Sequence, residues 1–368
     1  MKTSSPCLET HLCKGTSIES RRPRRAYFLE SSTESIFGNS IDTLKPGKGQ
    51  FDTEKFLAAF DTVLQGIGLR VALGKFAFLQ SLDKFWKKAR DEVYIFVDQQ
   101  IERAIEEAAK AKKTSSPTNS PSPNRRIVLL DEPFKTTQDR ISLRLQLLNI
   151  FITAGDQTAI AVENIFFHLA RHPEVWRRLQ NEVSNYDGPL TYESLKQMKY
   201  SKAIVNESKF NSQIIAPLMM VLTQYAKGLR ILALFGRSIR SCGKDCILST
   251  GGGSDGKDPV LFVRGTEVNY VFRSMHLDKD IWGADADEFR PERWEKIEKA
   301  QLQAYIPFPK GDRVFSAQKM VLNECVYILV RFAKTFKSLE NRDPKEKFVE
   351  QHKLQKESMN EVKVSFGL

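Results

Sequence analysis

Residues 141–169 read ISLRLQLLNIFITAGDQTAIAVENIFFHL, a long and mostly apolar stretch with Gly155 inside it. Its length exceeds that of an ordinary strand, and its apolar residues cover most sides of a helical projection. We therefore predict a helix here that is buried on most of its faces. A glycine and a threonine inside such a helix usually serve packing, so this stretch alone does not indicate a catalytic site.

Helical patterns flank this segment on both sides. Apolar residues recur at helical spacing within residues 51–112. Pro173 favours a helix start, because proline is well tolerated in a first turn. We predict a further helix from Thr191 towards Glu207 and a last one from about Gln318 to Phe336.

Short β-like segments follow residue 229. They comprise residues 247–248, 259–263 and 267–272, and glycine-rich turns at 251–256 separate them. The predicted fold class is therefore mainly α with a small β region.

Composition shifts divide the chain. Residues 1–26 are polar, end in a basic cluster and are predicted to form a disordered tail. Residues 27–113 read as a helical region, and residues 114–126 as a Ser/Pro linker with nothing to bury. Residues 127–368 form the main domain.

The net charge of the chain does not by itself exclude a class of partner. The 368 residues carry a formal net charge of +11, and 41% of them are hydrophobic, which argues against a wholly disordered chain. We find no basic stripe interleaved with aromatic residues and no zinc-finger spacing, so we expect no nucleic-acid partner. We also find no secretory signal and no apolar run long enough to span a bilayer, so we expect a soluble chain.

The five cysteines are an odd and scattered set, which fits a reducing compartment better than a disulfide framework. Cys242 and Cys246 are spaced C-x3-C, but no second Cys/His pair follows at metal-binding distance. We therefore interpret them as ordinary strand or loop cysteines and expect no metal site.

Three motifs follow one another along the chain: AGDQT at residues 154–158, FRPERW at 289–294 and PFPKGDRVFSAQ at 307–318. Together they resemble the cytochrome P450 family of haem-thiolate monooxygenases, from about residue 130 to 340. GGGSDG at residues 251–256 is similar to the fungal branch that hydroxylates alkanes and fatty acids. The resemblance implies an incomplete cytochrome P450 fold whose substrate-access region is residues 27–113.

The resemblance also implies a function. The family uses haem iron, dioxygen and electrons from an NADPH-dependent cytochrome reductase, and this branch would hydroxylate a long-chain apolar substrate such as an alkane or fatty acid. The family resides at the endoplasmic reticulum membrane. We find no membrane anchor in this chain, so its expected location is cytoplasmic or unknown.

By resemblance, the catalytic positions of the distal haem helix are Gly155, Gln157 and Thr158. Thr158 supplies the alcohol that the chemistry needs. Gln157 occupies the acid position and has no carboxylic proton to donate. Asp156 is its neighbour in the chain but points about 100° away around a helix.

The resemblance places haem-binding residues at Arg240, Phe308, Gly311, Arg313 and Phe315. Phe315 stands where the family has its cysteine ligand. A phenyl ring has no lone pair for iron, so the thiolate position is lost and no metal ligand remains there. Cys325 lies on the following helix, where we expect it to face the core rather than replace the ligand.

The family's structural Glu-Arg-Arg cluster would comprise Glu207, Arg230 and Arg293. Its E-x-x-R part is interrupted, and joining Ser208 to Leu229 restores the motif. Our hypothesis is that residues 209–228 derive from a retained intron, because Ser208-Lys209 and Leu222-Thr223 can encode a splice donor and a branch site. The alternative is a genuine surface loop.

The family's first third, with its membrane anchor and its W-x-x-x-R helix, has no counterpart that we recognise, so we expect an N-terminally truncated chain. WKKAR at residues 86–90 matches that helix pattern, but it lies too close to residue 154 and reads as part of a later helix. We predict an inactive chain, a pseudoenzyme, with exposed apolar surface and low solubility. The alternative is a non-catalytic remnant or a lipid-binding protein without haem.

Overall fold

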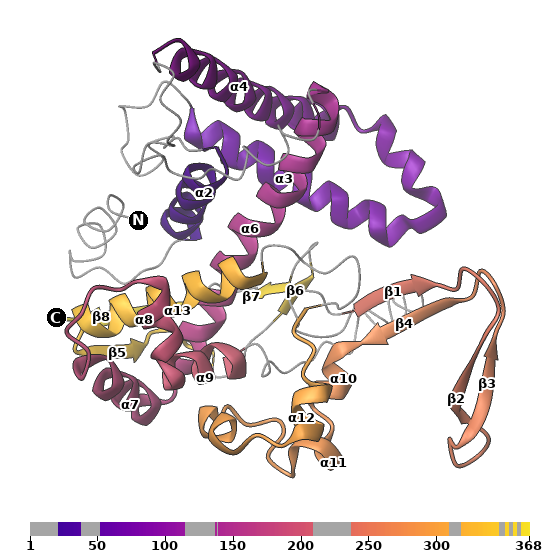
Figure 1. The fold of residues 1–368 in the computed structure, drawn as a ribbon, viewed down its shortest axis with the longest axis vertical. Helices are drawn as coiled ribbons and strands as arrows, with labels where there is room; N and C mark the ends of the chain where they lie inside the picture. The colour runs from indigo at the N-terminus through magenta and orange to yellow at the C-terminus, as the bar shows by residue number, and fades with distance from the viewer. Residues whose placement is uncertain are drawn as a thin grey trace. The chain divides into compact units, whose positions relative to one another are not determined.

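The computed structural model describes residues 21–37, 52–114, 137, 139–208, 237–308, 318–345, 350–352, 356–358 and 362–368 (Figure 1). The chain forms two compact units. The first unit comprises residues 1–208 and 316–368, and the second comprises residues 209–315. The two units are described separately below.

Helices build the first unit. In chain order they are α2 (Arg21–Phe37), α3 (Thr53–Leu73), the 3-10 helix η1 (Gly74–Leu82), α4 (Lys84–Thr114), α6 (Arg140–Leu169), α7 (Pro173–Ser184), α8 (Tyr192–Gln197), α9 (Lys199–Ser208) and α13 (Gln318–Thr335). Its short strands are β5 (Ser338–Asn341), β6 (Glu350–His352), β7 (Lys356–Ser358) and β8 (Val364–Gly367). Antiparallel pairs join β5 to β8 and β6 to β7.

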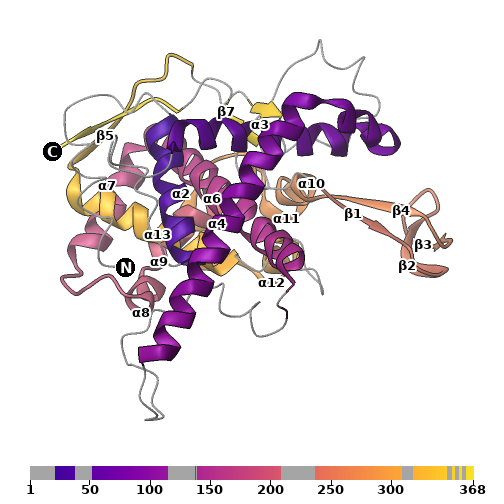
Figure 2. The same cartoon turned by 90° about the horizontal axis from the view of Figure 1, so that it is seen from above.

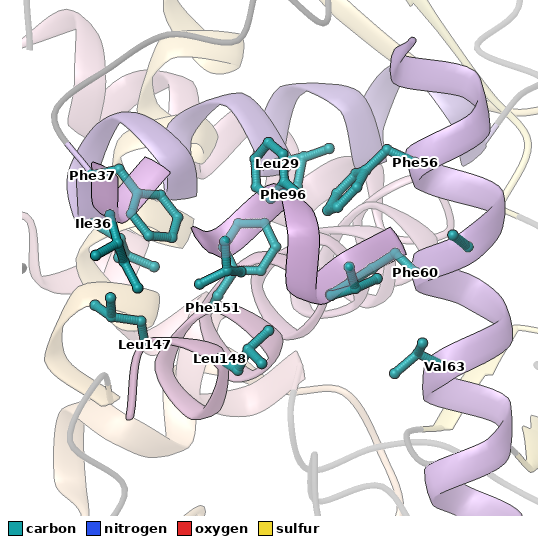
Figure 3. Packing of buried hydrophobic residues seen from close by; sticks show 14 of the residues in the cluster. Leu29, Ile36, Phe37, Phe56, Phe60, Val63, Phe96, Leu147, Leu148 and Phe151 are labelled. Atoms are coloured by element: carbon teal, nitrogen blue, oxygen red, sulfur yellow. The ribbon is translucent and has the colours of Figure 1, made fainter. Parts of the chain in front are cut away.

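A cluster of aliphatic and aromatic side chains fills the core between α2, α3, α4 and α6 (Figure 3). The rings of Phe56 and Phe96 lie 4.3 Å apart between centroids, and those of Phe96 and Phe151 lie 6.0 Å apart. Phe37 of α2 packs edge-on against Phe96. Tilted and edge-on ring pairs of this kind stabilise the core beyond the contribution of the large apolar area that each ring buries.

The second part of this core lies around α13, which packs against α6, α7 and α9. Phe366 of β8 contacts Phe166 of α6, Phe332 of α13 and Phe336 just beyond it. The β5–β8 pair is thereby held against the helices. The sequence prediction for the last helix is confirmed, because α13 spans Gln318–Thr335.

Local signals explain where α6 and α7 begin. The Asp139 carboxylate accepts hydrogen bonds from the backbone of Ile141 and Ser142, which caps the first turn of α6. Hydrogen bonds from the side chain and backbone of Ser142 lower the pKa of this carboxyl. Pro173 is the first residue of α7, as predicted.

Two sequence predictions differ from the structure. Helix α2 begins at Arg21, so the end of the predicted disordered tail is helical, and residues 1–20 lie outside the described residues. Pro23 is tolerated there because a first turn needs no intrahelical N–H donor at that position. The single helix predicted from Thr191 is two helices, α8 and α9, with Met198 between them.

The second unit holds the β region and short helices: β1 (Arg237–Ser241), β2 (Cys246–Gly252), β3 (Asp258–Phe262), β4 (Glu267–Val271), α10 (Phe272–His276), α11 (Lys279–Trp282), η3 (Pro291–Lys296) and α12 (Lys299–Ala304). The strands form two antiparallel ribbons, β1–β4 and β2–β3 (Figure 2). A small core gathers around Trp282, Ala286 and Ala304. The predicted β segments are confirmed.

Glycine is required in the β2–β3 connection. Gly251, Gly253 and Gly256 adopt φ angles of 120°, 75° and 71°, a region that side chains disfavour. The glycine-rich GGGSDG stretch therefore has a conformational role as a turn.

The fold class is mainly α with small strand pairs, as the sequence predicted. Among the described residues, no helix combines the length and apolar character needed to cross a bilayer. Large apolar side chains are nevertheless exposed along η1 and the start of α4, namely Phe76, Phe78, Leu79, Leu82 and Phe85.

Candidate functional site

The distal-helix motif lies in the middle of α6. The helix continues without a break from residue 154 to residue 158. The side chains of Asp156 and Gln157 lie outside the described residues, whereas Thr158 is described and fully buried. The backbone opening that the resemblance implies at Gly155 stays a prediction.

Thr158 meets a buried carboxyl group from α13. The Thr158 side chain hydrogen-bonds to Glu324, which is only 5% exposed. The Ser31 hydroxyl of α2 donates a second hydrogen bond to Glu324 Oε1 at 2.7 Å. Three helices thus converge on one carboxyl group, and we call Ser31, Thr158 and Glu324 the three-helix junction.

The environment of Glu324 favours its neutral form. Burial raises the pKa of this carboxyl to about 7, and the hydrogen bonds from Ser31 and Thr158 oppose that rise. The rise shows that desolvation outweighs both hydrogen bonds. A buried carboxyl of this kind holds its proton until the pH approaches neutrality.

Sequence reasoning missed Glu324, although a signal was present. Val321, Cys325 and Ile328 of α13 are buried, and Glu324 lies within the same helical stripe. A carboxylate among core positions needs partners or a proton, because burying a lone charge is costly. The position of Glu324 in an apolar stripe could have marked it as a buried and functional candidate.

The predicted Glu-Arg-Arg cluster is distributed over both units. Glu207 is fully buried in α9 of the first unit. Arg293 belongs to the second unit, and Arg230 lies outside the described residues. The cluster as a whole therefore stays a prediction.

Arg293 has several partners within its own unit. Its guanidinium donates to the backbone carbonyls of Asp285 at 2.9 Å and Glu288 at 3.2 Å, and it pairs with the Asp285 carboxylate at 3.5 Å. A further hydrogen bond reaches the carbonyl of Trp282. The Arg293 side chain is 4% exposed. It therefore acts as a buried crosslink between η3 and the loop that joins α11 to η3.

The haem-binding positions are only partly described. Arg240 is exposed in β1, opposite Val268 of β4, and Phe308 is buried in the same unit. Gly311, Arg313 and Phe315 lie outside the described residues. The haem-binding assignment therefore stays a prediction.

A buried histidine fixes the segment that leads to Phe308. The Ile306 backbone N–H donates to His276 Nε2 at 2.9 Å, which ties this segment to α10. Burial lowers the pKa of His276 to about 4, so the ring is neutral near pH 7 and accepts this bond. The Tyr305 ring lies 5.6 Å from the His276 ring and 4.6 Å from that of Trp294.

The donor set does not fit a haem-thiolate site. Phe315 offers no lone pair at the ligand position. Cys325 is fully buried in α13, as predicted, and packs within the core of the first unit. The described residues contain no cluster of three or more His, Cys, Asp or Glu side chains suited to a metal ion.

The WKKAR match lies near the start of α4. Trp86 lies in the first turn of α4, and its indole N–H donates to the Val63 carbonyl of α3 at 3.4 Å. Arg90 pairs with its neighbour Asp91. Trp86 thereby links α4 to α3, and the assignment of this motif to a later helix of the family stays a prediction.

Comparison with known proteins establishes the class. The sequence profile described as cytochrome P450 matches residues 10–208 and 256–364. The match covers most of the chain, so the protein belongs to the cytochrome P450 family.

The following three relatives are fungal proteins. The chain is 33% identical to cytochrome P450 52A9 of Candida maltosa over 331 residues, in an alignment that covers 85% of this chain. It is 32% identical over 327 residues to cytochrome P450 monooxygenase FPY7 of Fusarium mangiferae, covering 87% of this chain. It is 33% identical over 341 residues to cytochrome P450 monooxygenase iliC of Hypocrea jecorina, covering 92% of this chain.

The chain matches only part of each relative. The aligned region covers 58% of cytochrome P450 52A9, 57% of FPY7 and 70% of iliC. The activity of the complete relatives therefore bears on this chain only as a proposal.

Proposed function

We propose that this chain derives from a monooxygenase that hydroxylates a long-chain apolar substrate, an alkane or a fatty acid, and that it is inactive as written. One observation carries the proposal: the ligand position of the PFPKGDRVFSAQ segment holds Phe315. Without a thiolate on the iron, the family's oxygen chemistry has no ligand to support it.

Further departures support the inactive state. Gln157 replaces the acid beside Thr158, and the Thr158 hydroxyl is hydrogen-bonded to Glu324. That hydroxyl therefore contacts a carboxyl of α13 in the core. The substrate class rests on the GGGSDG resemblance alone, and the turn role of its glycines accounts for their conformation without any substrate.

The test is the reduced carbon-monoxide difference spectrum of the chain after reconstitution with haem. We expect no red-shifted Soret band of the thiolate type. The informative variant combines Phe315→Cys with deletion of residues 209–228, because it restores both the ligand and the E-x-x-R spacing. We expect this variant to gain the band.

Each spectral result has a distinct meaning. A thiolate-type band in the unmodified chain would show that another cysteine reaches the iron, and the inactive assignment would fail. No band in the restored variant would show that Phe315 is not the decisive defect. Thermal stabilisation by fatty acids without any haem would instead favour a lipid-binding protein.

The interruption at residues 209–228 is part of the proposal. The family profile breaks off at Ser208, the residue after which we place the insertion, and resumes at residue 256. The proposed intron-derived segment thus lies within the unmatched stretch 209–255. Sequencing of transcripts tests it. We expect most reads to join Ser208 to Leu229, and reads running through the segment as the main species would establish a genuine insertion.

The reductase partner is also a proposal. An intact member of the family would accept electrons from an NADPH-dependent reductase, and the net charge of +11 would suit an acidic partner. We expect the unmodified chain to leave the NADPH consumption of such a reductase unchanged. The restored variant should raise it in the presence of a fatty acid.

A further inference from the structure

Two cysteine side chains meet at the turn between β1 and β2. The Sγ atoms of Cys242 and Cys246 lie 4.0 Å apart. Both are free thiols, Cys246 is exposed and Cys242 is half-buried. This pair lies outside every motif that the family resemblance assigns.

Backbone hydrogen bonds hold the two cysteines close. Cys242 donates its N–H to the Thr266 carbonyl at 2.9 Å and accepts from Gly265 N–H at 2.8 Å. Cys246 is the first residue of β2 and pairs with Phe262 of β3. Because ribbons anchor both ends of the turn, the sulfur atoms stay near each other without help from the intervening residues.

Side-chain contacts stabilise the turn as well. The Asp245 carboxylate accepts a hydrogen bond from the Arg264 N–H at 2.7 Å, which ties the turn to the segment between β3 and β4. Lys244 is exposed between the two cysteines. Burial, together with the neighbouring Cys246 thiol, raises the pKa of Cys242, so the exposed Cys246 is the cysteine placed to meet an oxidant from solvent first.

The separation is that of two unbonded sulfur atoms in contact. A disulfide requires about 2 Å between sulfur atoms, which rotation of the two side chains can supply when the Cβ atoms are already close. A metal site would need further ligands, and the described residues offer no third His, Cys, Asp or Glu in a suitable cluster. The geometry therefore favours oxidation over metal binding.

We propose that Cys242 and Cys246 form a reversible disulfide when the protein meets a peroxide. The exposed Cys246 thiol gives its proton to solvent, its thiolate attacks one peroxide oxygen, and the O–O bond breaks. A sulfenic acid forms, and the departing hydroxide takes a proton from solvent and leaves as water. The Cys242 sulfur then attacks the sulfenic sulfur, and a second water leaves with the Cys242 proton. Two thiols are oxidised and one peroxide is reduced to two waters.

A reducing compartment, as the cysteine count predicts, keeps the pair as thiols until an oxidant appears. The disulfide would close the turn between β1 and β2 and reduce its freedom. A small-molecule dithiol would reverse the change by exchange. The site is thus a modification site within the β region.

The sequence provides a direct readout. Trypsin cleaves after Arg240, Lys244 and Lys257, so the two cysteines fall on separate peptides, SCGK at residues 241–244 and DCILSTGGGSDGK at residues 245–257. We expect hydrogen peroxide in small molar excess to join these peptides in the folded chain. Alkylation before digestion should label both cysteines only in the untreated sample, and dithiothreitol should release the joined pair.

Matched variants and an internal control sharpen the test. Cys242→Ser and Cys246→Ser should each abolish the joined species. The fully buried Cys325 should remain available for alkylation after denaturation. The same treatment in urea tests whether the fold matters, and we expect slower joining there.

Two results would overturn the proposal. One is full alkylation of both peptides, or over-oxidation of Cys246 without joining, in the folded chain. The other is equal joining rates in the folded and unfolded chain, because proximity along the sequence alone would then explain the linkage.

Discussion

At the scale of single residues, Glu324 governs how the first unit responds to pH. Its folded pKa of about 7 lies above the ordinary value of 4.5 because of burial, so the folded state binds the proton more tightly than the unfolded state. The associated stabilisation is complete below pH 4.5 and is lost as the pH rises through 7. The difference amounts to about 3 kcal/mol by the usual conversion.

We therefore predict that Glu324→Gln stabilises the protein at about pH 8 relative to the unmodified chain and has a smaller effect near pH 5. The neutral amide avoids the buried charge while keeping a hydrogen-bond acceptor for Ser31 and Thr158. Thermal unfolding across this pH range provides the measurement. Glu340→Gln, at an exposed position of β5, serves as control, and an identical pH profile for both variants would contradict the role of Glu324.

Arg293 is the second residue of this kind, because its burial decides how much its ion pair with Asp285 contributes to stability. Replacing it with methionine removes a buried cation and leaves the Asp285 carboxylate and the carbonyl of Glu288 without this donor. We predict a loss of about 3–5 kcal/mol in the local stability of the second unit. Hydrogen exchange of peptides covering residues 278–305 of the full chain measures this loss.

The matched control for Arg293 is Arg290, which pairs with the same Asp285 carboxylate at 2.6 Å but has a side chain that is 52% exposed. We predict that Arg290→Met costs no more than about 1 kcal/mol, since exposed ion pairs contribute little. Equal protection loss in both variants would show that burial is not the deciding factor.

At the scale of elements, aromatic packing joins α6 to α3 and α4. Phe151 of α6 is 1% exposed and contacts the rings of Phe60 and Phe96. Its replacement by alanine leaves a cavity that these rings cannot fill. We predict that Phe151→Ala lowers the free energy of unfolding by about 3–5 kcal/mol.

Denaturant unfolding monitored by circular dichroism checks this prediction. Phe85→Ala is the control because Phe85 is 85% exposed at the start of α4. Its loss should change the unfolding midpoint little. A Phe151→Ala midpoint equal to that of the control would mean that this cluster does not hold the helices together.

At the scale of the whole molecule, exposed apolar side chains should limit solubility. Phe76, Phe78, Leu82 and Phe85 are each more than 60% exposed within a short stretch of chain. Large exposed apolar patches promote association. We predict that a variant with serine at these four positions is less aggregated in size-exclusion chromatography than the unmodified chain.

A control for solubility is Leu302→Ser in α12, a single exposed apolar residue outside this stretch. It should leave the elution profile unchanged, because isolated exposed apolar residues are common on protein surfaces. A monodisperse unmodified chain would contradict the expected association.

The sequence by itself determined the family, the mainly helical fold class and the β segments. These features follow from local periodicity, turn residues and motif order, which a linear reading captures. It also placed Cys325 in the core, because an apolar stripe on one helix predicts burial. It was wrong at the start of α2 and between α8 and α9, where a proline in a first turn and a break at Met198 set the helix limits.

Only the tertiary structure decided which polar groups meet. Ser31 and Glu324 are 293 residues apart in the chain, yet they share a hydrogen bond. His276 likewise meets Ile306 only through packing, and Cys242 meets Cys246 because two ribbons anchor their turn. Such contacts depend on how elements pack, and packing is set by the burial of whole helix faces rather than by any short motif.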